Sequence, residues 1–224
     1  MATKTKRIMY LTPKGTALFA HIKDPDFGNE KYPNPEGAYR VTLILDDAQS
    51  MRLRDKLSDE IDKAREFAEE KFNSLKRSTR EKIGKLSFND VCSPEYDKDD
   101  NPTGNYKWNF KCNYKFEDKN TGKKIERHIP VFDSMNQPVK LKDEIGNGSE
   151  IRVSFCANPY FVEGQGMGGL TMYINAIQVA KMVKGGERTA ESYGFEVDED
   201  GYVSDVNEDV ASHDKEDEDN DIPF

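Results

Sequence analysis

The stretch from Asn105 to Phe116 alternates large apolar and polar side chains at every second position, and it constrains the fold more than any other part of the sequence. A period of two is that of a β-strand with one face in a core and the other in solvent. One face carries Tyr106, Trp108, Phe110, Cys112, Tyr114 and Phe116, and the other carries Lys107, Asn109, Lys111, Asn113 and Lys115. This strand needs partner strands to cover its aromatic face.

Runs of β-branched and apolar residues predict those partners. The predicted strands are 15–22, 38–45, 105–116, 123–132, 151–161 and 170–183. Residues 24–37 contain too many prolines and glycines for regular structure, whereas 123–132 follow a turn at 120–122 and return as a hairpin partner of the alternating strand. The alternation of the last strand slips near Ala176, which indicates a bulge.

One long helix is predicted between the second and third strands. Asp46 or Asp47 caps it, and Gln49 stands at capping-box distance from Asp46. Apolar residues then recur at steps of three or four to about residue 80, which gives an apolar stripe on a charged helix. Together these elements predict a mainly β fold, an OB-fold-like barrel of five to six strands with one inserted α-helix.

The charge of the chain divides it near residue 187. Residues 187–224 hold 15 acidic and 2 basic side chains, whereas residues 1–186 hold 27 acidic and 31 basic ones. We therefore expect a mildly basic barrel domain over 1–186, a partly ordered linker over 187–204 and a disordered acidic tail over 205–224. The tail ends on an apolar tip, which favours a protein-interaction segment over a merely solvating one. Its candidate contact residues are Asp217, Glu218, Asp219, Asp221, Ile222, Pro223 and Phe224.

Several function classes are not supported by the sequence. Three scattered cysteines and three unclustered histidines indicate neither a disulfide framework nor a metal site. The glycine-rich residues 164–169 lack the Lys-Ser/Thr of a phosphate-binding loop, and no catalytic triad or carboxylate pair stands out. We expect a binding protein without cofactor or metal, not an enzyme. The first residues lack the apolar core of a signal peptide, and no apolar run reaches spanning length, so we expect a cytosolic protein without a membrane partner.

Interleaved aromatic and basic side chains are typical of surfaces that hold single-stranded nucleic acid, because rings stack on bases while cations follow the phosphates. The stacking candidates are Tyr106, Trp108, Tyr160 and Phe161. The phosphate candidates are Arg40, Lys107, Lys111, Lys115, Lys123, Lys124, Arg127 and Arg152. A second interpretation stays open, in which the rings fill the core and the lysines only face water.

At these residues the chain resembles the single-stranded DNA-binding proteins of T7-like phages. The similarity is carried by segments in the same order along nearly the whole chain, namely 23–30, 34–39, Phe110-Lys111-Cys112 with Phe116, Asp133-Ser134, 145–149, Pro159-Tyr160, Gly201-Tyr202-Val203 and the acidic tail with its terminal Phe224. The resemblance implies sequence-independent binding and annealing of single-stranded DNA in replication, recombination and repair in the host cytoplasm. It also implies a homodimer.

The resemblance further implies that Tyr160 contacts DNA, and that the tail competes with DNA for the groove. Phe224 would be the terminal contact residue of a tail that recruits DNA polymerase and primase-helicase. One departure is Glu36, which stands where the family has a basic residue before the loop glycine; Arg40 is the candidate replacement. The tip Ile222-Pro223-Phe224 is also similar to that of bacterial single-stranded DNA-binding proteins, which implies host proteins as partners. Two rival hypotheses are an adaptor that binds no DNA and captures host proteins through its tail, and an acidic DNA mimic that inhibits a host nuclease.

Overall fold

The computed structural model describes residues 8–118 and 122–183, which belong to one unit, Met1–Glu187. The predicted linker 187–204, the tail 205–224 and most of the predicted turn at 120–122 lie outside the described residues. The strands are β1 Tyr10–Leu11, β2 Gly15–Gly28, β3 Pro33–Asp46, β4 Ser87–Phe88, β5 Ser93–Tyr96, β6 Pro102–Asn113, β7 Lys115–Glu117, β8 Lys124–Glu126, β9 Val131–Phe132, β10 Glu150–Val162 and β11 Met167–Lys181. The helices are α1 Asp47–Lys56, α2 Ser58–Ser74 and α3 Arg77–Ile83.

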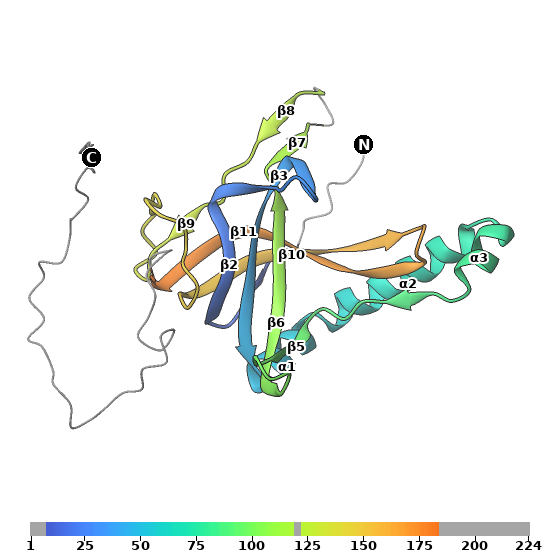
Figure 1. The fold of residues 1–224 in the computed structure, drawn as a ribbon, viewed down its shortest axis with the longest axis horizontal. Helices are drawn as coiled ribbons and strands as arrows, with labels where there is room; N and C mark the ends of the chain where they lie inside the picture. Colours follow the sequence, from blue (N-terminus) through green and yellow to red (C-terminus); the bar gives the residue numbers. More distant parts are fainter. Residues whose placement is uncertain (1–7, 119–121, 184–224) are drawn as a thin grey trace, which may run out of the picture. The chain divides into compact units, whose positions relative to one another are not determined.

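Five long strands close into a barrel (Figure 1). The order β10-β2-β3-β6-β11 returns to its start because β11 also pairs with β10 over the whole of both strands. Two of the contacts that close the barrel are short, because β2 meets β10 only at Gly15 and Thr16, and β6 meets β11 only at Phe110 and Lys111. The prediction of a mainly β fold with a five- to six-stranded barrel is therefore confirmed.

The alternation of β6 sets the core. Trp108, Phe110 and Cys112 are buried, whereas Asn109, Lys111 and Asn113 between them are exposed. The same period governs β3 and β10, whose inward side chains complete the apolar interior. The largest fully buried side chains include Tyr39, Leu43, Leu45, Phe110 and Phe155. The polar side chains of β6 are left on the outer face of the barrel.

The prediction of one continuous helix is wrong, because the insertion contains three helices. The capping box at Asp46 and Gln49 is present and starts α1. Leu57, fully buried, then interrupts the helix with φ −99° and ψ 2°, and Leu75 ends α2 with an extended ψ of 151°. The apolar stripe is real, but these two leucines leave helical geometry, which the three- and four-residue steps alone could not reveal.

Two strand predictions also need correction. Residues 24–37 are regular, since β2 runs to Gly28 and β3 begins at Pro33, joined by a turn in which Asn29 and Tyr32 bond to each other. Prolines are tolerated there because the ladder of this ribbon is irregular, with a register shift on each side of its Asp26 pair. Residues 123–132 do not pair with the length of 105–116; only β8 returns, and its partner is the short strand β7.

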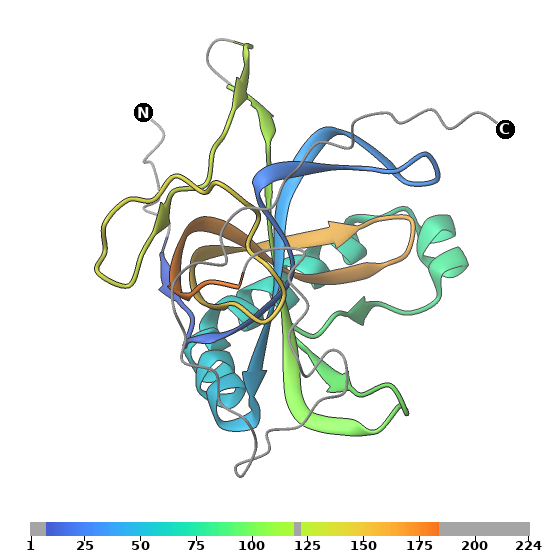
Figure 2. The same cartoon turned by 60° about the vertical axis from the view of Figure 1, so that its left-hand side comes forward.

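The β10–β11 hairpin is supported by the helical insertion (Figure 2). Gly168 on β11 leaves no room for a Cβ atom against Ala68 of α2, and Ala68 is fully buried. Phe72 of α2 and Ile83 of α3 likewise approach Gly166 near the tip of the hairpin. A two-stranded ribbon is marginally stable in water by itself. The helices therefore hold this hairpin in place.

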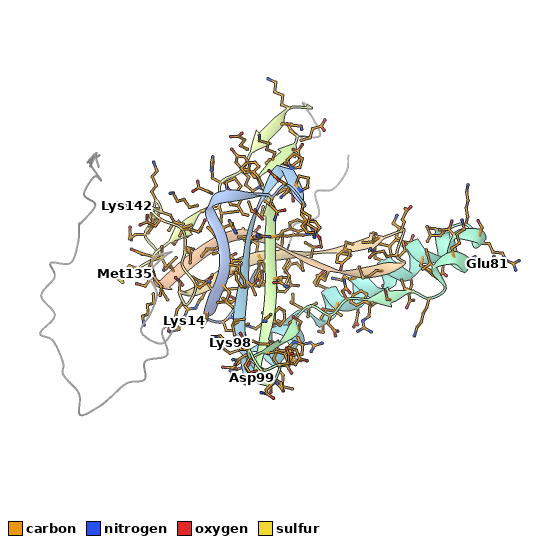
Figure 3. The ribbon with its side chains drawn as sticks, in the orientation of Figure 1. Lys14, Glu81, Lys98, Asp99, Met135 and Lys142 are labelled. Carbon is orange, nitrogen blue, oxygen red and sulfur yellow. The ribbon has the colours of Figure 1, made fainter. Side chains whose placement is uncertain are left out.

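The long loop between β9 and β10 carries exposed side chains such as Met135 and Lys142, while Glu81 lies on α3 on the other side of the view (Figure 3). Within the residues that the structure describes, no helix combines the length and apolarity needed to cross a membrane.

Candidate nucleic-acid interface

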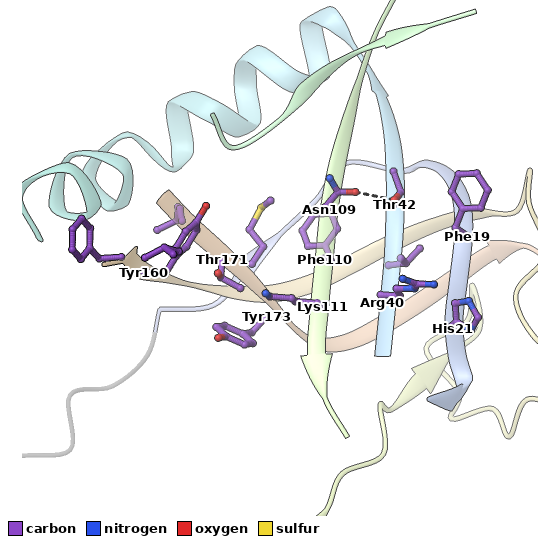
Figure 4. Close-up of a pocket in the computed structure, with 15 residues that line it drawn as sticks. Phe19, His21, Arg40, Thr42, Asn109, Phe110, Lys111, Tyr160, Thr171 and Tyr173 are labelled. Carbon is purple, nitrogen blue, oxygen red and sulfur yellow. Dashed lines mark hydrogen bonds between the residues drawn. The ribbon is translucent and has the colours of Figure 1, made fainter. Parts of the chain in front are cut away.

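A cavity of about 920 Å³ lies on the outer face of the barrel, where β2, β3 and β6 meet the β10–β11 hairpin (Figure 4). It is lined by Phe19, His21, Arg40, Val41, Thr42, Asn109, Phe110, Lys111, Tyr160, Phe161, Val162, Leu170, Thr171, Met172 and Tyr173. We call this cavity the groove. It takes side chains from β2, β3, β6, β10 and β11, so the barrel closure itself assembles it.

Two cations and a polar pair lie in the middle of the groove. Arg40 pairs with Lys111 across the β3–β6 ladder, which places both side chains on the same outer face. Arg40 is half exposed, and its Nη2 lies 2.8 Å from the Asp26 carboxylate. Beside them Thr42 Oγ1 donates to Asn109 Oδ1 at 2.8 Å. Because ion pairs at the surface are worth about 0–1 kcal/mol, Asp26 does not prevent Arg40 from meeting another anion.

Tyr160 occupies the hairpin end of the groove. Its ring lies over Gly169, its direct partner on β11, so closely that a Cβ atom at Gly169 would be 2.6–2.7 Å from Oη, Cε1 and Cζ. Its hydroxyl accepts a 2.7 Å hydrogen bond from Asn89 Nδ2, and Asn89 in turn bonds to the backbone of Gly168. Both contacts hold the ring in one orientation. Phe161 follows it on β10 and also lines the groove.

Four of the twelve predicted DNA-binding residues meet in the groove, namely Arg40, Lys111, Tyr160 and Phe161. The prediction that Trp108 stacks on bases is wrong, because its side chain has no exposed surface and its Nε1 donates to the buried Ser50 of α1 at 3.0 Å. Tyr106 is half-buried and packs against the same core. The strand carries its rings inward because α1 covers this end of β6.

The remaining predicted cations do not line the groove. Lys124 Nζ lies 2.7 Å from the carboxylate of Glu36, which lowers the pKa of Glu36 and raises that of Lys124. Lys115 pairs with Glu126 at 3.8 Å, and Arg152 donates to Gln178. Neither Lys107 nor Lys123 contributes to the groove lining. The acidic departure at Glu36 thus forms a surface ion pair with Lys124 outside the groove, whereas Arg40 and Lys111 lie in the groove.

Arg127 lines a second cavity, of about 530 Å³, which shares Tyr173 with the groove. Its guanidinium lies 4.8 Å from the ring centre of Phe116, and its Nη1 donates to Cys112 Sγ at 2.9 Å. Asn113, Asn158 and other polar residues form much of the rest of the lining. The outer face thus continues from the groove past Tyr173 toward β7 and β8.

Sequence reasoning missed several groove residues, chiefly Phe19, His21 and Tyr173. Phe19 and His21 stand in a predicted strand, but their common face could be found only from the β2–β3 pairing. Tyr173 could be placed in the groove only once the register of the last strand was known. There β11 pairs in parallel with β6, so that Tyr173 lies opposite Lys111. Among the described residues no cluster of three or more His, Cys, Asp or Glu could hold a metal, and the three cysteines are free and buried.

Comparisons of the sequence and of the structure with known proteins all match single-stranded DNA-binding proteins of phages. Residues 14–181 match the family model described as single-stranded DNA-binding protein, bacteriophage T7. The chain is 26% identical to the single-stranded DNA-binding protein of Enterobacteria phage T3 over 89% of this chain and 87% of the relative. It is 26% identical to that of Escherichia phage T7 over 88% and 85%. The crystal structure of gp2.5, a single-stranded DNA-binding protein encoded by bacteriophage T7, has the same fold, with a TM-score of 0.65, 22% identity and coverage of 89% of this chain and 100% of that one.

Proposed function

The chain belongs to the family of bacteriophage T7 single-stranded DNA-binding proteins, and on that premise we propose that its groove binds single-stranded DNA without sequence preference. The relatives in phages T3 and T7 are named for this activity. The proposed function is binding and not catalysis.

The observation that carries the proposal is the meeting of two exposed cations with aromatic rings in one groove. Arg40 and Lys111 come from neighbouring strands, and Tyr160 and Phe161 come from the hairpin beside them. Cations hold the phosphates of a single strand, and rings stack on its bases with about 1–3 kcal/mol per base. Every base offers a π-face, so such a surface needs no particular sequence.

In this proposal Arg40 and Lys111 contact phosphates while Tyr160 and Phe161 stack. Arg40 exchanges part of its contact with Asp26 for a phosphate oxygen. The held orientation of Tyr160 reduces the entropy that its ring loses when a base stacks on it. Arg127, in the neighbouring cavity, extends the positive surface beyond Tyr173.

Substitution of the two groove cations tests the proposal. Arg40→Ala and Lys111→Ala should each weaken binding of labelled oligo-dT, measured by fluorescence anisotropy over a series of salt concentrations. The slope of log affinity against log salt should become shallower by about 0.7 for each cation that no longer meets a phosphate. Lys98→Ala, an exposed lysine in the β5–β6 loop, serves as the matched control and should leave the slope unchanged.

The same titration separates the rival functions. An adaptor whose tail captures proteins, or a DNA mimic that inhibits a host protein, would bind no oligo-dT at low salt. A mimic would also present acids on the barrel, whereas residues 1–186 hold 27 acidic and 31 basic side chains. The groove cations and this charge balance favour the DNA binder.

We extend the proposal to the wider role of such a protein. It would protect and anneal single strands in replication, recombination and repair in the host cytoplasm, and would act as a homodimer. Its tail would compete with DNA for the groove. The tail would also recruit DNA polymerase and primase-helicase, or host proteins, through Asp217 to Phe224. The support is the composition of that segment, an acidic run that ends on Ile222-Pro223-Phe224.

A further inference from the structure

Phe19 is an exposed aromatic residue at the β2 end of the groove, opposite the end that Tyr160 occupies (Figure 4). Its side chain is 66% exposed, although it stands in the middle of a fourteen-residue strand. A single exposed phenylalanine needs no explanation. The backbone conformation of Phe19 does need an explanation, because its φ is +51°.

A positive φ is costly for a bulky residue, since its Cβ crowds the backbone in the left-handed region. Strained conformations of this kind persist where the surrounding structure enforces them, and they cluster at functional sites. The strain arises at a bulge. Leu18 pairs with Thr42 and His21 pairs with Arg40, so that Phe19 and Ala20 together oppose the single residue Val41.

The loop before β10 holds this bulge from the other side. Asn147 Oδ1 accepts a 2.7 Å hydrogen bond from the Phe19 N–H, and the Glu144 carboxylate accepts from the N–H groups of Ile22 and Lys23 at 2.9 and 3.1 Å. Two side chains thus replace a neighbouring strand along this edge of β2. The bulge is fixed, and the ring of Phe19 is turned out to the groove.

We propose that Phe19 is a base-stacking platform held in place by Asn147, and that a single strand crosses the barrel from Tyr160 to Phe19. This inference rests on the proposed function and adds the path of the strand. The path leaves the β10–β11 hairpin and crosses β11, β6, β3 and β2 in that order. Lys111 and Arg40 lie between the two rings, where the phosphates of the intervening nucleotides would pass.

Phe19→Asn tests the ring without disturbing the bulge, because asparagine tolerates positive φ. Affinity for oligo-dT should fall about 5- to 150-fold, the range expected when one base stack is removed. The urea midpoint should stay the same or rise, since the strained phenylalanine is gone. Phe19→Tyr keeps an aromatic ring at this position and should bind oligo-dT with wild-type affinity. Tyr96→Asn, at a comparably exposed aromatic residue on β5, is the matched control and should leave affinity unchanged.

Asn147→Ala tests the positioning role. It should weaken binding in the wild-type background and have no further effect when Phe19 is already asparagine. Photocrosslinking then tests the path. An oligonucleotide with one iodouracil at each position in turn should crosslink to Phe19 and Tyr160 from different positions along its length.

Two results would overturn the inference. They are wild-type affinity of Phe19→Asn for oligo-dT, whatever its urea midpoint, and crosslinks to both rings from the same position. Failure of the wild-type protein to bind oligo-dT would instead refute the proposed function, so the two failures are distinguishable.

Discussion

Gly169→Ala should weaken DNA binding although Gly169 itself touches no DNA in the proposed complex. The new Cβ atom would lie 2.6–2.7 Å from three atoms of the Tyr160 side chain, closer than van der Waals contact allows. The φ of Gly169 is outside the positive region, so the backbone accepts alanine. The substitution therefore moves the ring of Tyr160 without removing it.

The size of the effect follows from what the displaced ring no longer contributes. One base stack is worth about 1–3 kcal/mol, so affinity should fall by up to about 150-fold, and Tyr160→Ala sets the limit. The displaced hydroxyl also loses its hydrogen bond from Asn89. A hydrogen bond contributes about 0.5–1.5 kcal/mol to the free energy of unfolding, and the exposure of Asn89 favours the lower value.

A double-mutant cycle measures this coupling. Gly169→Ala, Tyr160→Ala and the double variant are titrated with oligo-dT by anisotropy at one fixed salt concentration. If the ring transmits the effect, the double variant should bind like Tyr160→Ala alone. Gly164→Ala in the same hairpin, where a Cβ atom would meet nothing within 4 Å, should bind like the wild type. The reasoning would be refuted if Gly169→Ala weakened oligo-dT binding as much in the Tyr160→Ala background as it does in the wild-type protein.

Two further predictions concern the core and the tail. Trp108→Phe should lower the free energy of unfolding by about 1–3 kcal/mol, because the buried Ser50 hydroxyl loses its partner, yet oligo-dT affinity should be unchanged; urea unfolding and anisotropy check both. Weaker binding with unchanged stability would show that Trp108 reaches DNA after all. Removal of residues 205–224 should tighten binding at low salt, because a tethered acidic segment competes at an effective concentration of about millimolar. Equal affinities of the full-length and truncated proteins would exclude that competition.

The parts of the fold that follow from local periodicity could be predicted from the sequence. Alternation identified β6, and the capping box at Asp46 located the start of α1. The break at Leu57 could not be predicted, because this leucine fits the apolar stripe and leaves helical geometry only where the insertion packs on the core. The ribbon over 24–37 could not be predicted either. Its prolines are tolerated because the hydrogen-bond ladder is irregular there, and that irregularity depends on how β2 pairs with β3.

The residues that line the candidate site were predictable only where a side chain's chemistry and its strand face agreed. Lys111 and Tyr160 satisfied both conditions. Trp108 has the chemistry of a stacking residue but the face of a core residue, and the sequence of β6 alone does not say which face is covered. Phe19 was not predicted as a stacking residue for the opposite reason, because the sequence does not show that its ring faces the groove. Its exposure comes from a bulge that depends on the register with β3 and on Asn147, which is 128 residues away in the sequence.

The close approach of Gly168 to Ala68 links the helical insertion to the groove. Tyr160 lies on the hairpin that α2 supports, so the proposed DNA surface is correctly shaped only while that helix is seated. The two events then share a coupling free energy, and the coupling is reciprocal. A substitution at Ala68 that loosens the helix would raise the dissociation constant for DNA, and bound DNA would oppose local unfolding of the insertion by the same free energy.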